Sequence, residues 1–104
     1  VELLFAEDGV LVDPIGTPAR HGRAEIQEFL SGVLSLYDKF GVSENYVFVH
    51  ENTAVVKWTG NGIGKNGRSF TFEGIDIFEL NEQGKIQSLK AYWDAEPTLK
   101  VLNS

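Results

Sequence analysis

The 104-residue sequence contains no cysteine and no methionine, and it has only three prolines and two histidines. The absence of cysteine excludes disulfide bonds and thiolate metal sites. His21 and His50 lie far apart and follow no spacing typical of metal ligands, so we expect no metal site. Apolar runs are too short for a membrane-spanning helix, and a basic segment followed by an apolar one, as in a signal peptide, does not open the chain. We therefore expect a cytoplasmic protein that does not insert into a membrane.

Basic side chains are also scarce. Nine Lys and Arg residues stand against 15 Asp and Glu residues, which gives a formal net charge of -6, and the basic residues form no cluster. This balance argues against binding to nucleic acid or to an anionic membrane surface. Hydrophobic residues make up 42% of the chain and charged residues 23%, as in ordinary globular proteins, and the length suits one domain over residues 1–104.

Hydrophobic periodicity and turn signals predict a helix, a strand, a second helix and then four strands. Residues 1–9 resemble the end of a helix, with Leu3 and Leu4 in its apolar stripe and Gly9 as its stop. Because no initiator Met precedes this segment, we expect the chain to lack an N-terminal part of the natural protein, including most of a first helix. A short strand is predicted at 10–13, and apolar residues at i, i+3, i+4 and i+7 predict a helix over 23–36.

The second half of the chain is predicted to be β-structure. We expect strands at 42–49, 53–60, 68–80 and 85–94, with a break at 37–41 and turns at 51–52, 65–67 and 81–84. This order predicts an α+β fold in which helices cover one face of a curved antiparallel sheet. Such a sheet would wrap around a helix and leave a conical cavity, a kind of place that ligand sites favour.

The strand predicted over 68–80 is the most informative, because a carboxylate interrupts its apolar face. Alternate positions of a strand share a face, and here they are Phe70, Phe72, Gly74, Asp76, Phe78 and Leu80. The other face is more polar, so Asp76 is expected to point inward. A carboxyl group in apolar surroundings tends to stay protonated, and in that form it can donate a hydrogen bond.

Asp13 is the second candidate, at the end of a short strand and in what we expect to be a wetter setting beside Pro14. Two carboxyl groups whose environments separate their pKa values are typical of an acid and a base with distinct roles. Other interpretations stay open. Asp before proline is a common turn residue, a one-residue slip would turn Asp76 to solvent, and Tyr92 could pair with Asp76. Trp58 and Trp93 are more often core residues than ligand walls.

Several short segments are similar to the nuclear transport factor 2-like superfamily, and within it to the bacterial Δ5-3-ketosteroid isomerase group. They are FAEDG at 5–9, VDPIG at 12–16, HGR at 21–23, IDIF at 75–78, NEQGKI at 81–86 and AYW at 91–93. The resemblance covers residues 3–99. It implies an α+β barrel with a conical cavity, Asp13 as a general base, Asp76 as a protonated donor of an oxyanion hole, and Trp93 as a pocket wall. It also implies that no cofactor is needed and that the protein forms a homodimer.

The resemblance has two gaps. Leu30 stands where the family has a supporting tyrosine, and the family's principal oxyanion tyrosine belongs to the first helix, which this chain is expected to lack. Losing one such donor typically costs about 10²–10³-fold in turnover.

The sequence therefore leaves three alternative functions. The first is an enzyme, a steroid delta-isomerase-like isomerase that moves a proton allylically in a hydrophobic enone through a dienolate. Its substrate would be bound by Phe29, Leu30, Phe72, Phe78 and Trp93. The second is a SnoaL-like polyketide cyclase or another enzyme of this fold that acts on a hydrophobic ligand. The third is a non-enzymatic ligand-binding or dimerisation module, whose surface would include the region of Val55 and Trp58.

Overall fold

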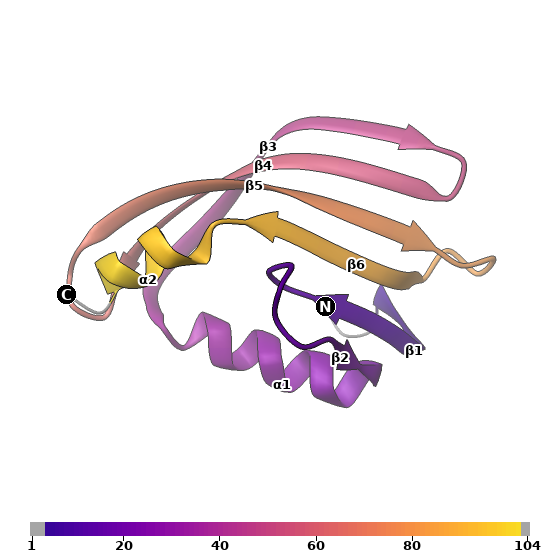
Figure 1. Cartoon of the computed structure of the whole chain (residues 1–104), viewed down its shortest axis with the longest axis horizontal. Coiled ribbons are helices and arrows are strands. Elements are labelled where there is room, and N and C mark those ends of the chain that lie inside the picture. The colour runs from indigo at the N-terminus through magenta and orange to yellow at the C-terminus, as the bar shows by residue number, and fades with distance from the viewer. Residues whose placement is uncertain (1–3, 103–104) are drawn as a thin grey trace.

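The computed structural model of the protein describes residues 4–102. In this part of the chain, one sheet and two helices follow one another as shown in Figure 1. The strands are β1 (Phe5–Val12), β2 (Arg20–His21), β3 (Tyr37–His50), β4 (Thr53–Gly64), β5 (Ser69–Leu80) and β6 (Ile86–Trp93), and the helices are α1 (Gly22–Leu34) and α2 (Ala95–Leu102). Neither described helix has both the length and the apolar character needed to cross a membrane.

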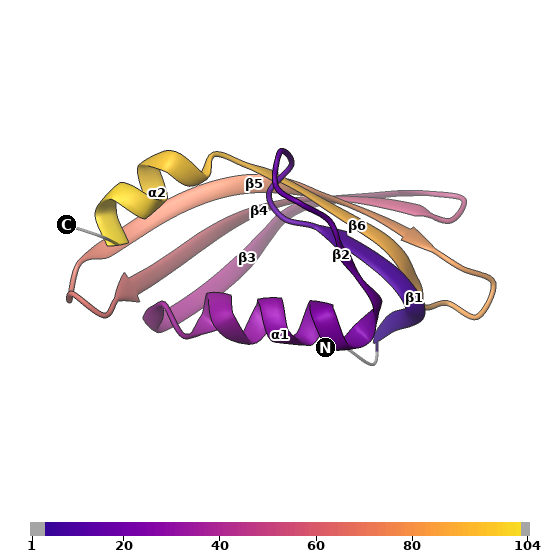
Figure 2. The ribbon, with the colours of Figure 1, turned by 60° about the horizontal axis from the view of Figure 1, so that its bottom comes forward.

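The strands form one sheet in the order β2-β1-β6-β5-β4-β3. The sheet is strongly curved, and α1 lies along its concave side in both ribbon views (Figures 1 and 2). The α+β fold with a curved sheet is thus confirmed. The sheet does not close into a barrel, because β2 and β3 remain at opposite edges. It is also not wholly antiparallel, since β1 pairs with β6 in parallel.

A small core holds α1 against the sheet. Phe5 and Leu11 of β1 and Ile26 of α1 are almost completely buried, and partly buried residues of α1 and β6 pack around them. Complete burial of one such side chain contributes about 1.5–3 kcal/mol. The apolar stripe predicted for 23–36 is therefore the face by which α1 covers the concave side of the sheet.

The first strand corrects the prediction for residues 1–9. Residues 1–3 lie outside the described part, but from Phe5 onward the chain is a strand and not the end of a helix. The pairing of β1 with β6 shifts in register between Phe5 and Val10. A Cβ atom on Gly9 would lie 3.1 Å from a carbonyl oxygen of β6, that of Ile86. Gly9 therefore permits a close backbone approach within an irregular strand, a role that the local pattern did not reveal.

The predicted break at 37–41 is wrong as well, because β3 begins at Tyr37. Tyr37 pairs with Gly64 and Phe40 with Gly62, so the glycine-rich stretch after residue 60 is part of β4 and not a loop. Asp38, Lys39 and Gly41 are poor strand formers, and pairing with β4 overrides their preference. Beyond Tyr37, every residue of β3 is exposed, and β3 is paired only with β4 at the edge of the sheet.

The turns that organise the antiparallel strands lie where the sequence predicts them. Gly67 and Gly84 adopt positive φ angles of 79° and 76° in the turns before β5 and β6. The Asn81 side chain also accepts hydrogen bonds from the backbone N–H groups of Gln83 and Lys85. Because these turns set the register of the strands, they also decide which side chains reach the concave face.

Candidate functional site

A cavity of about 400 Å³ is lined by residues of α1 and of the concave face of the sheet. Its aromatic lining residues are Tyr37, Phe40, Trp58, Phe72 and Trp93, and its acidic ones are Asp13, Glu44 and Asp76. Leu30, Val33 and Leu34 of α1 supply aliphatic surface. No Lys, Arg or His lines this cavity among the residues that the structure describes. The cavity thus combines apolar walls with acidic groups that have no cationic partner there.

Asp76 faces this cavity from the middle of β5, as the alternation of the strand predicts. Its Oδ1 atom accepts a hydrogen bond from the indole Nε1–H of Trp58 at 3.0 Å. Burial raises the pKa of Asp76 to about 6 and outweighs the hydrogen bond from Trp58, which lowers it. The donor is therefore Trp58 and not Tyr92, whose side chain is 43% exposed.

Gly74 makes room for the contact between Trp58 and Asp76. Gly74 pairs directly with Trp58 on β4 and with Trp93 on β6. A Cβ atom at this position would lie 2.5 Å from Cζ2 of Trp58 and 2.9 Å from Cβ of Trp93. Because glycine has no side chain, the indole of Trp58 can lie across β5 toward Asp76, two residues away on the same face.

Asp13 reaches the same cavity from the segment that follows β1. The backbone N–H of Ile15 donates a hydrogen bond to the carbonyl of Ala91 at 2.8 Å, so this segment is held against β6. Oδ1 of Asp13 accepts a hydrogen bond of 2.6 Å from Nε1–H of Trp93. Burial raises the pKa of Asp13, and the Trp93 hydrogen bond opposes this shift. The expectation of a wetter setting for Asp13 is therefore wrong, because the indole of Trp93 and the cavity walls remove it from water.

The two carboxyl groups also influence each other. The negative charge of Asp13 adds to the upward shift in the pKa of Asp76, because a second negative charge in the same cavity is unfavourable. Each group is fixed through one oxygen by a tryptophan, which leaves the other oxygen available to a ligand. The arrangement can hold a proton on one carboxyl group while the other accepts one.

Aromatic rings make a continuous wall beside the two carboxyl groups. The Phe72 ring lies 5.1 Å from the ring of Trp93 and meets the ring of Trp58 edge-on at 5.2 Å. Phe70 stacks on Phe72 at 5.6 Å, and Tyr37 stacks on Phe40 at 4.9 Å. Such ring pairs are stabilising beyond the area that they bury, and they offer flat apolar surfaces to a ring-shaped ligand.

Three of the five predicted substrate-binding residues line the cavity, and two do not. Leu30, Phe72 and Trp93 line the cavity. Phe78 is absent from this lining, although it lies on the same face as Asp76. It pairs with Ala54 and with Leu89, farther along the sheet.

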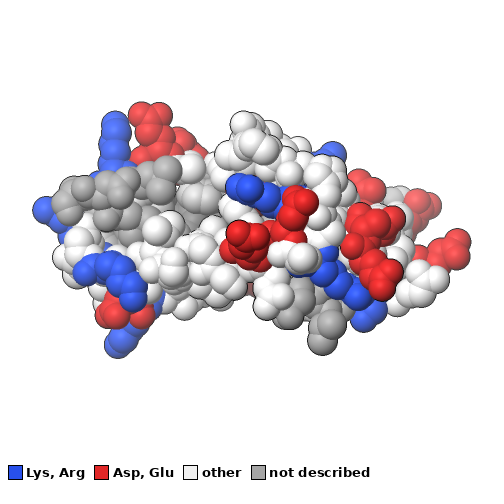
Figure 3. All heavy atoms as spheres, turned by 90° about the horizontal axis from the view of Figure 1, so that it is seen from below, with Lys and Arg blue, Asp and Glu red and all other residues white. Residues whose placement is uncertain are grey.

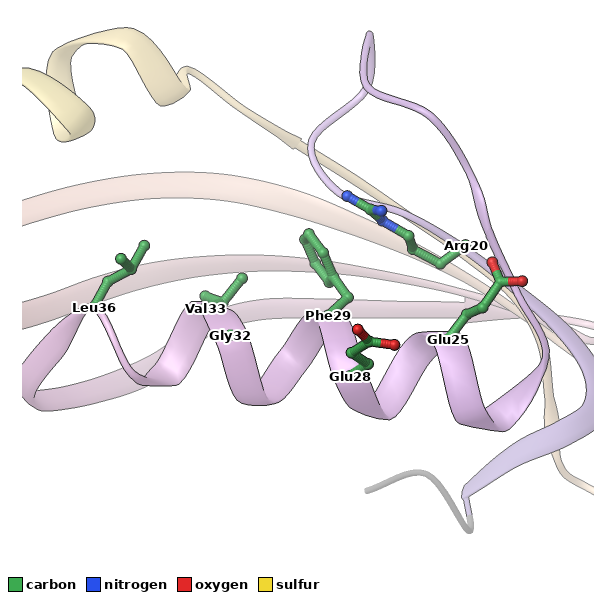
Figure 4. Close-up of a pocket in the computed structure, with 7 residues that line it drawn as sticks. All are labelled: Arg20, Glu25, Glu28, Phe29, Gly32, Val33 and Leu36. Carbon is green, nitrogen blue, oxygen red and sulfur yellow. The ribbon is translucent and has the colours of Figure 1, made fainter.

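Phe29 lies in a separate groove beside α1 (Figure 4). There the guanidinium of Arg20 stacks over the Phe29 ring at 4.6 Å, and Glu25 and Glu28 lie on the same stretch of helix. Consecutive residues of an α-helix point about 100° apart, so Phe29 and Leu30 face different hollows.

On the side of the molecule that carries α1, basic side chains are dispersed among acidic and uncharged ones (Figure 3).

Sequence reasoning missed several residues of the cavity. Trp58 was interpreted as a core residue, although its pairing opposite a glycine within an apolar face is a signal for a ring lying across that glycine. Residues 37–41 were predicted to be a break, so Tyr37 and Phe40 were missed, and Glu44 was not singled out within the predicted strand 42–49. Within the described residues, no three His, Cys, Asp or Glu side chains are grouped so as to hold a metal ion.

Comparison with known proteins is consistent with this fold. The family model described as "SnoaL-like domain" matches residues 1–89. The chain is 27% identical over 94 residues to a steroid delta-isomerase of Nocardioides simplex, covering 89% of this chain and 73% of that protein.

Solved structures give the same fold. A nuclear transport factor 2-like protein of unknown function from Burkholderia pseudomallei superposes with a TM-score of 0.88 at 16% identity, covering 98% of this chain and 82% of the other. A putative SnoaL-like polyketide cyclase from a Jannaschia species has a TM-score of 0.86 at 13% identity, covering 96% and 74%. Since the family model spans most of the sequence and the neighbours share the curved sheet, the chain belongs to the SnoaL-like domain family of the nuclear transport factor 2-like fold.

Proposed function

We propose that the protein is a cofactor-independent isomerase that moves a proton between two carbons of a neutral, hydrophobic enone. One observation carries the proposal: Asp13 and Asp76 share a single apolar cavity, and each is fixed through one oxygen by an indole N–H. The similarity to a steroid delta-isomerase supports the same reaction type. The absence of cationic side chains from the cavity lining, among the described residues, favours a neutral ligand over an anionic one.

In the proposed reaction, Asp13 is ionised and acts as the base. Its free oxygen removes a proton from the carbon between the carbonyl and the double bond of a β,γ-unsaturated ketone. The electron pair of that C–H bond moves toward the carbonyl and gives a dienolate. Asp13 then returns the proton to the γ-carbon, the carbonyl re-forms, and the double bond becomes conjugated. No atom or electron is gained or lost in the whole reaction.

Asp76 is proposed to be protonated and to stabilise the dienolate oxygen by donating a hydrogen bond. With a pKa of about 6, the protonated form dominates only below that pH. At pH 7, about one tenth of the molecules would carry this proton, since one pH unit corresponds to a tenfold change in ratio. This is less than the sequence-based expectation of a neutral carboxyl at pH 7. A bound ligand that displaces water would raise the pKa further, because desolvation is its main cause.

The direct test is the conversion of 5-androstene-3,17-dione, followed by the absorbance of the conjugated enone that forms. Asp13→Asn preserves the shape of the side chain but removes its basicity, and we expect it to reduce kcat by about 10²–10⁴-fold. Asp38→Asn is the matched control, because Asp38 is an exposed residue of β3 that does not line the cavity. Equal rates for the wild type, the Asp13 variant and buffer would reject the proposal.

A second candidate is a SnoaL-like cyclase that closes a ring within a polyketide. The family and the similarity to a putative polyketide cyclase favour it. The same two groups could serve, with Asp13 removing a proton from a carbon and Asp76 donating a hydrogen bond to the carbonyl that this carbon attacks. Ring closure of an aromatic polyketide ester, together with no conversion of the steroid, would identify this reaction.

The non-enzymatic alternative loses part of its structural basis. Trp58 points into the cavity, whereas its near neighbour Val55 alternates to the opposite face of β4, so the two do not form one surface. Homodimer formation and a cytoplasmic location remain predictions.

A further inference from the structure

Tyr37 adds a further titratable group to the wall of the cavity, beside Asp13 and Asp76, and the proposed reaction does not use it. The Tyr37 side chain is only 7% exposed and lines the cavity from the first position of β3. Its ring packs on the rings of Phe40, at a centroid distance of 4.9 Å, and Phe70, at 5.3 Å. These contacts limit the directions that the hydroxyl group can take.

The Tyr37 hydroxyl makes no hydrogen bond to any residue in the described part of the chain. Because the described residues contain no sealed side-chain polar atom without a partner, the hydroxyl is not cut off from solvent, and Tyr37 lines the cavity. A ligand that displaces this solvent leaves the hydroxyl without a partner unless the ligand itself forms a hydrogen bond with it, and an unpartnered hydroxyl group in apolar surroundings costs free energy. A ligand atom in the cavity can supply that partner.

The hydroxyl is suited to be a donor and not an anion. Burial raises the pKa of Tyr37, and the negative charge of Asp13 raises it further. The phenol therefore keeps its proton, and it favours a ligand oxygen that accepts a hydrogen bond.

Tyr37 and Asp76 approach the cavity from different ends. Tyr37 pairs with Gly64 at the end of β4, whereas Asp76 pairs with Val56 nearer its beginning. The Phe72 ring lies between them along the aromatic wall, since it contacts both Phe70 and the two tryptophans. Asp13 lines the same cavity, and its negative charge raises the pKa of both Tyr37 and Asp76.

We propose that Tyr37 binds a second oxygen of the ligand, so that the cavity selects neutral ring compounds with one oxygen at the Asp76 end and another at the Tyr37 end. Tyr37 is then a specificity-determining residue, distinct from the pair that handles the proton. This inference rests on the cavity being the ligand site of the proposed function, but its test does not require turnover.

The test compares two saturated steroids, 5α-androstane-3,17-dione and 5α-androstan-3-one, which differ by one oxygen and cannot isomerise. Binding is followed by tryptophan fluorescence, because Trp58 and Trp93 are the only tryptophans in the sequence and both line the cavity. The wild type should bind the dione about two- to tenfold more tightly, the range for one neutral hydrogen bond. Tyr37→Phe should bind the two steroids equally.

Tyr37→Phe keeps the ring that packs on Phe40 and Phe70, so its melting temperature should match that of the wild type. Tyr46→Phe is the control, since Tyr46 is 62% exposed and outside the cavity lining, and it should retain the preference for the dione. A dione preference that survives in Tyr37→Phe, or no fluorescence change with either steroid, overturns the inference. If the preference disappears as expected but 5-androstene-3,17-dione is not converted, only the isomerase proposal fails.

Discussion

Replacing Asp76 with Asn should stabilise the fold at high pH and leave it nearly unchanged at low pH. Burial raises the pKa of Asp76 from 3.8 to about 6 in the folded protein. A raised carboxyl pKa means that folding favours the protonated form, so the contribution of Asp76 to stability is fully present below pH 3.8 and is lost as the pH rises through about 6. An asparagine does not titrate, so it avoids the cost of holding a charge in the cavity.

The size of the effect follows from the shift. A difference of about two pKa units corresponds to at most about 3 kcal/mol at pH 8, at ~1.36 kcal/mol per unit. Because Asp76 is only partly buried and water reaches the cavity, we expect about 1–2 kcal/mol. For a domain of this size, this corresponds to an increase in Tm of very roughly 4–16 °C. The asparagine can still accept the hydrogen bond from Trp58 through its amide oxygen.

Thermal unfolding followed by circular dichroism at pH 4 and pH 8 measures this difference. Asp76→Asn should raise Tm relative to the wild type mainly at pH 8. The control variant Asp38→Asn changes an exposed carboxylate, and its effect on Tm should be small at both pH values. The reasoning is refuted if the Tm difference between Asp76→Asn and the wild type is the same at pH 4 and pH 8.

Two further variants test the groups around Asp76. Trp58→Phe removes the hydrogen bond that lowers the pKa of Asp76, so the infrared carboxyl band of Asp76 should titrate above pH 6. Any activity that needs the protonated acid should then extend to higher pH. An unchanged or lower midpoint of the carboxyl titration would contradict this. Gly74→Ala would place a Cβ atom 2.5 Å from the Trp58 ring, and we expect urea unfolding to show a loss of about 1–3 kcal/mol. Gly32→Ala is its control, because nothing lies within 4 Å of the added atom on α1, and a helix gains about 0.5–1 kcal/mol from this change. Equal effects of the two glycine substitutions would show that the close packing at Gly74 has no energetic weight.

Patterns that repeat within one strand or helix were sufficient to predict much of the site. The alternation of β5 placed Asp76 and Phe72 on the concave face, and turn residues such as Asn81 and Gly84 set the limits of the strands. The stripe of α1 likewise predicted that Leu30 faces the cavity. Each of these inferences needs only the local sequence and the period of the element.

Contacts between distant segments decided the rest. Residues 5–9 carry no alternation that indicates a strand, and it is pairing with β6, about 80 residues later, that makes them one. The local sequence predicts a wetter setting for Asp13 beside Pro14, whereas the indole of Trp93, 80 residues later, donates a hydrogen bond to it. The local sequence around Tyr37 contains poor strand formers, and the partner strand that orders it comes more than twenty residues later. Local propensity is a weak prior wherever such pairing is available.

The edge position of β3 has a consequence for how tightly any molecule could be held. One side of the cavity is formed by residues of β3, namely Tyr37, Phe40, Val42 and Glu44, yet β3 is hydrogen-bonded to β4 alone. A wall attached along one border opens at lower energy than a strand flanked on both sides. A ligand that contacts these residues of β3 therefore also stabilises the edge of the sheet, and part of its binding free energy is used to order this strand. Compounds that contact only Asp13 and Asp76 would not stabilise β3 in this way.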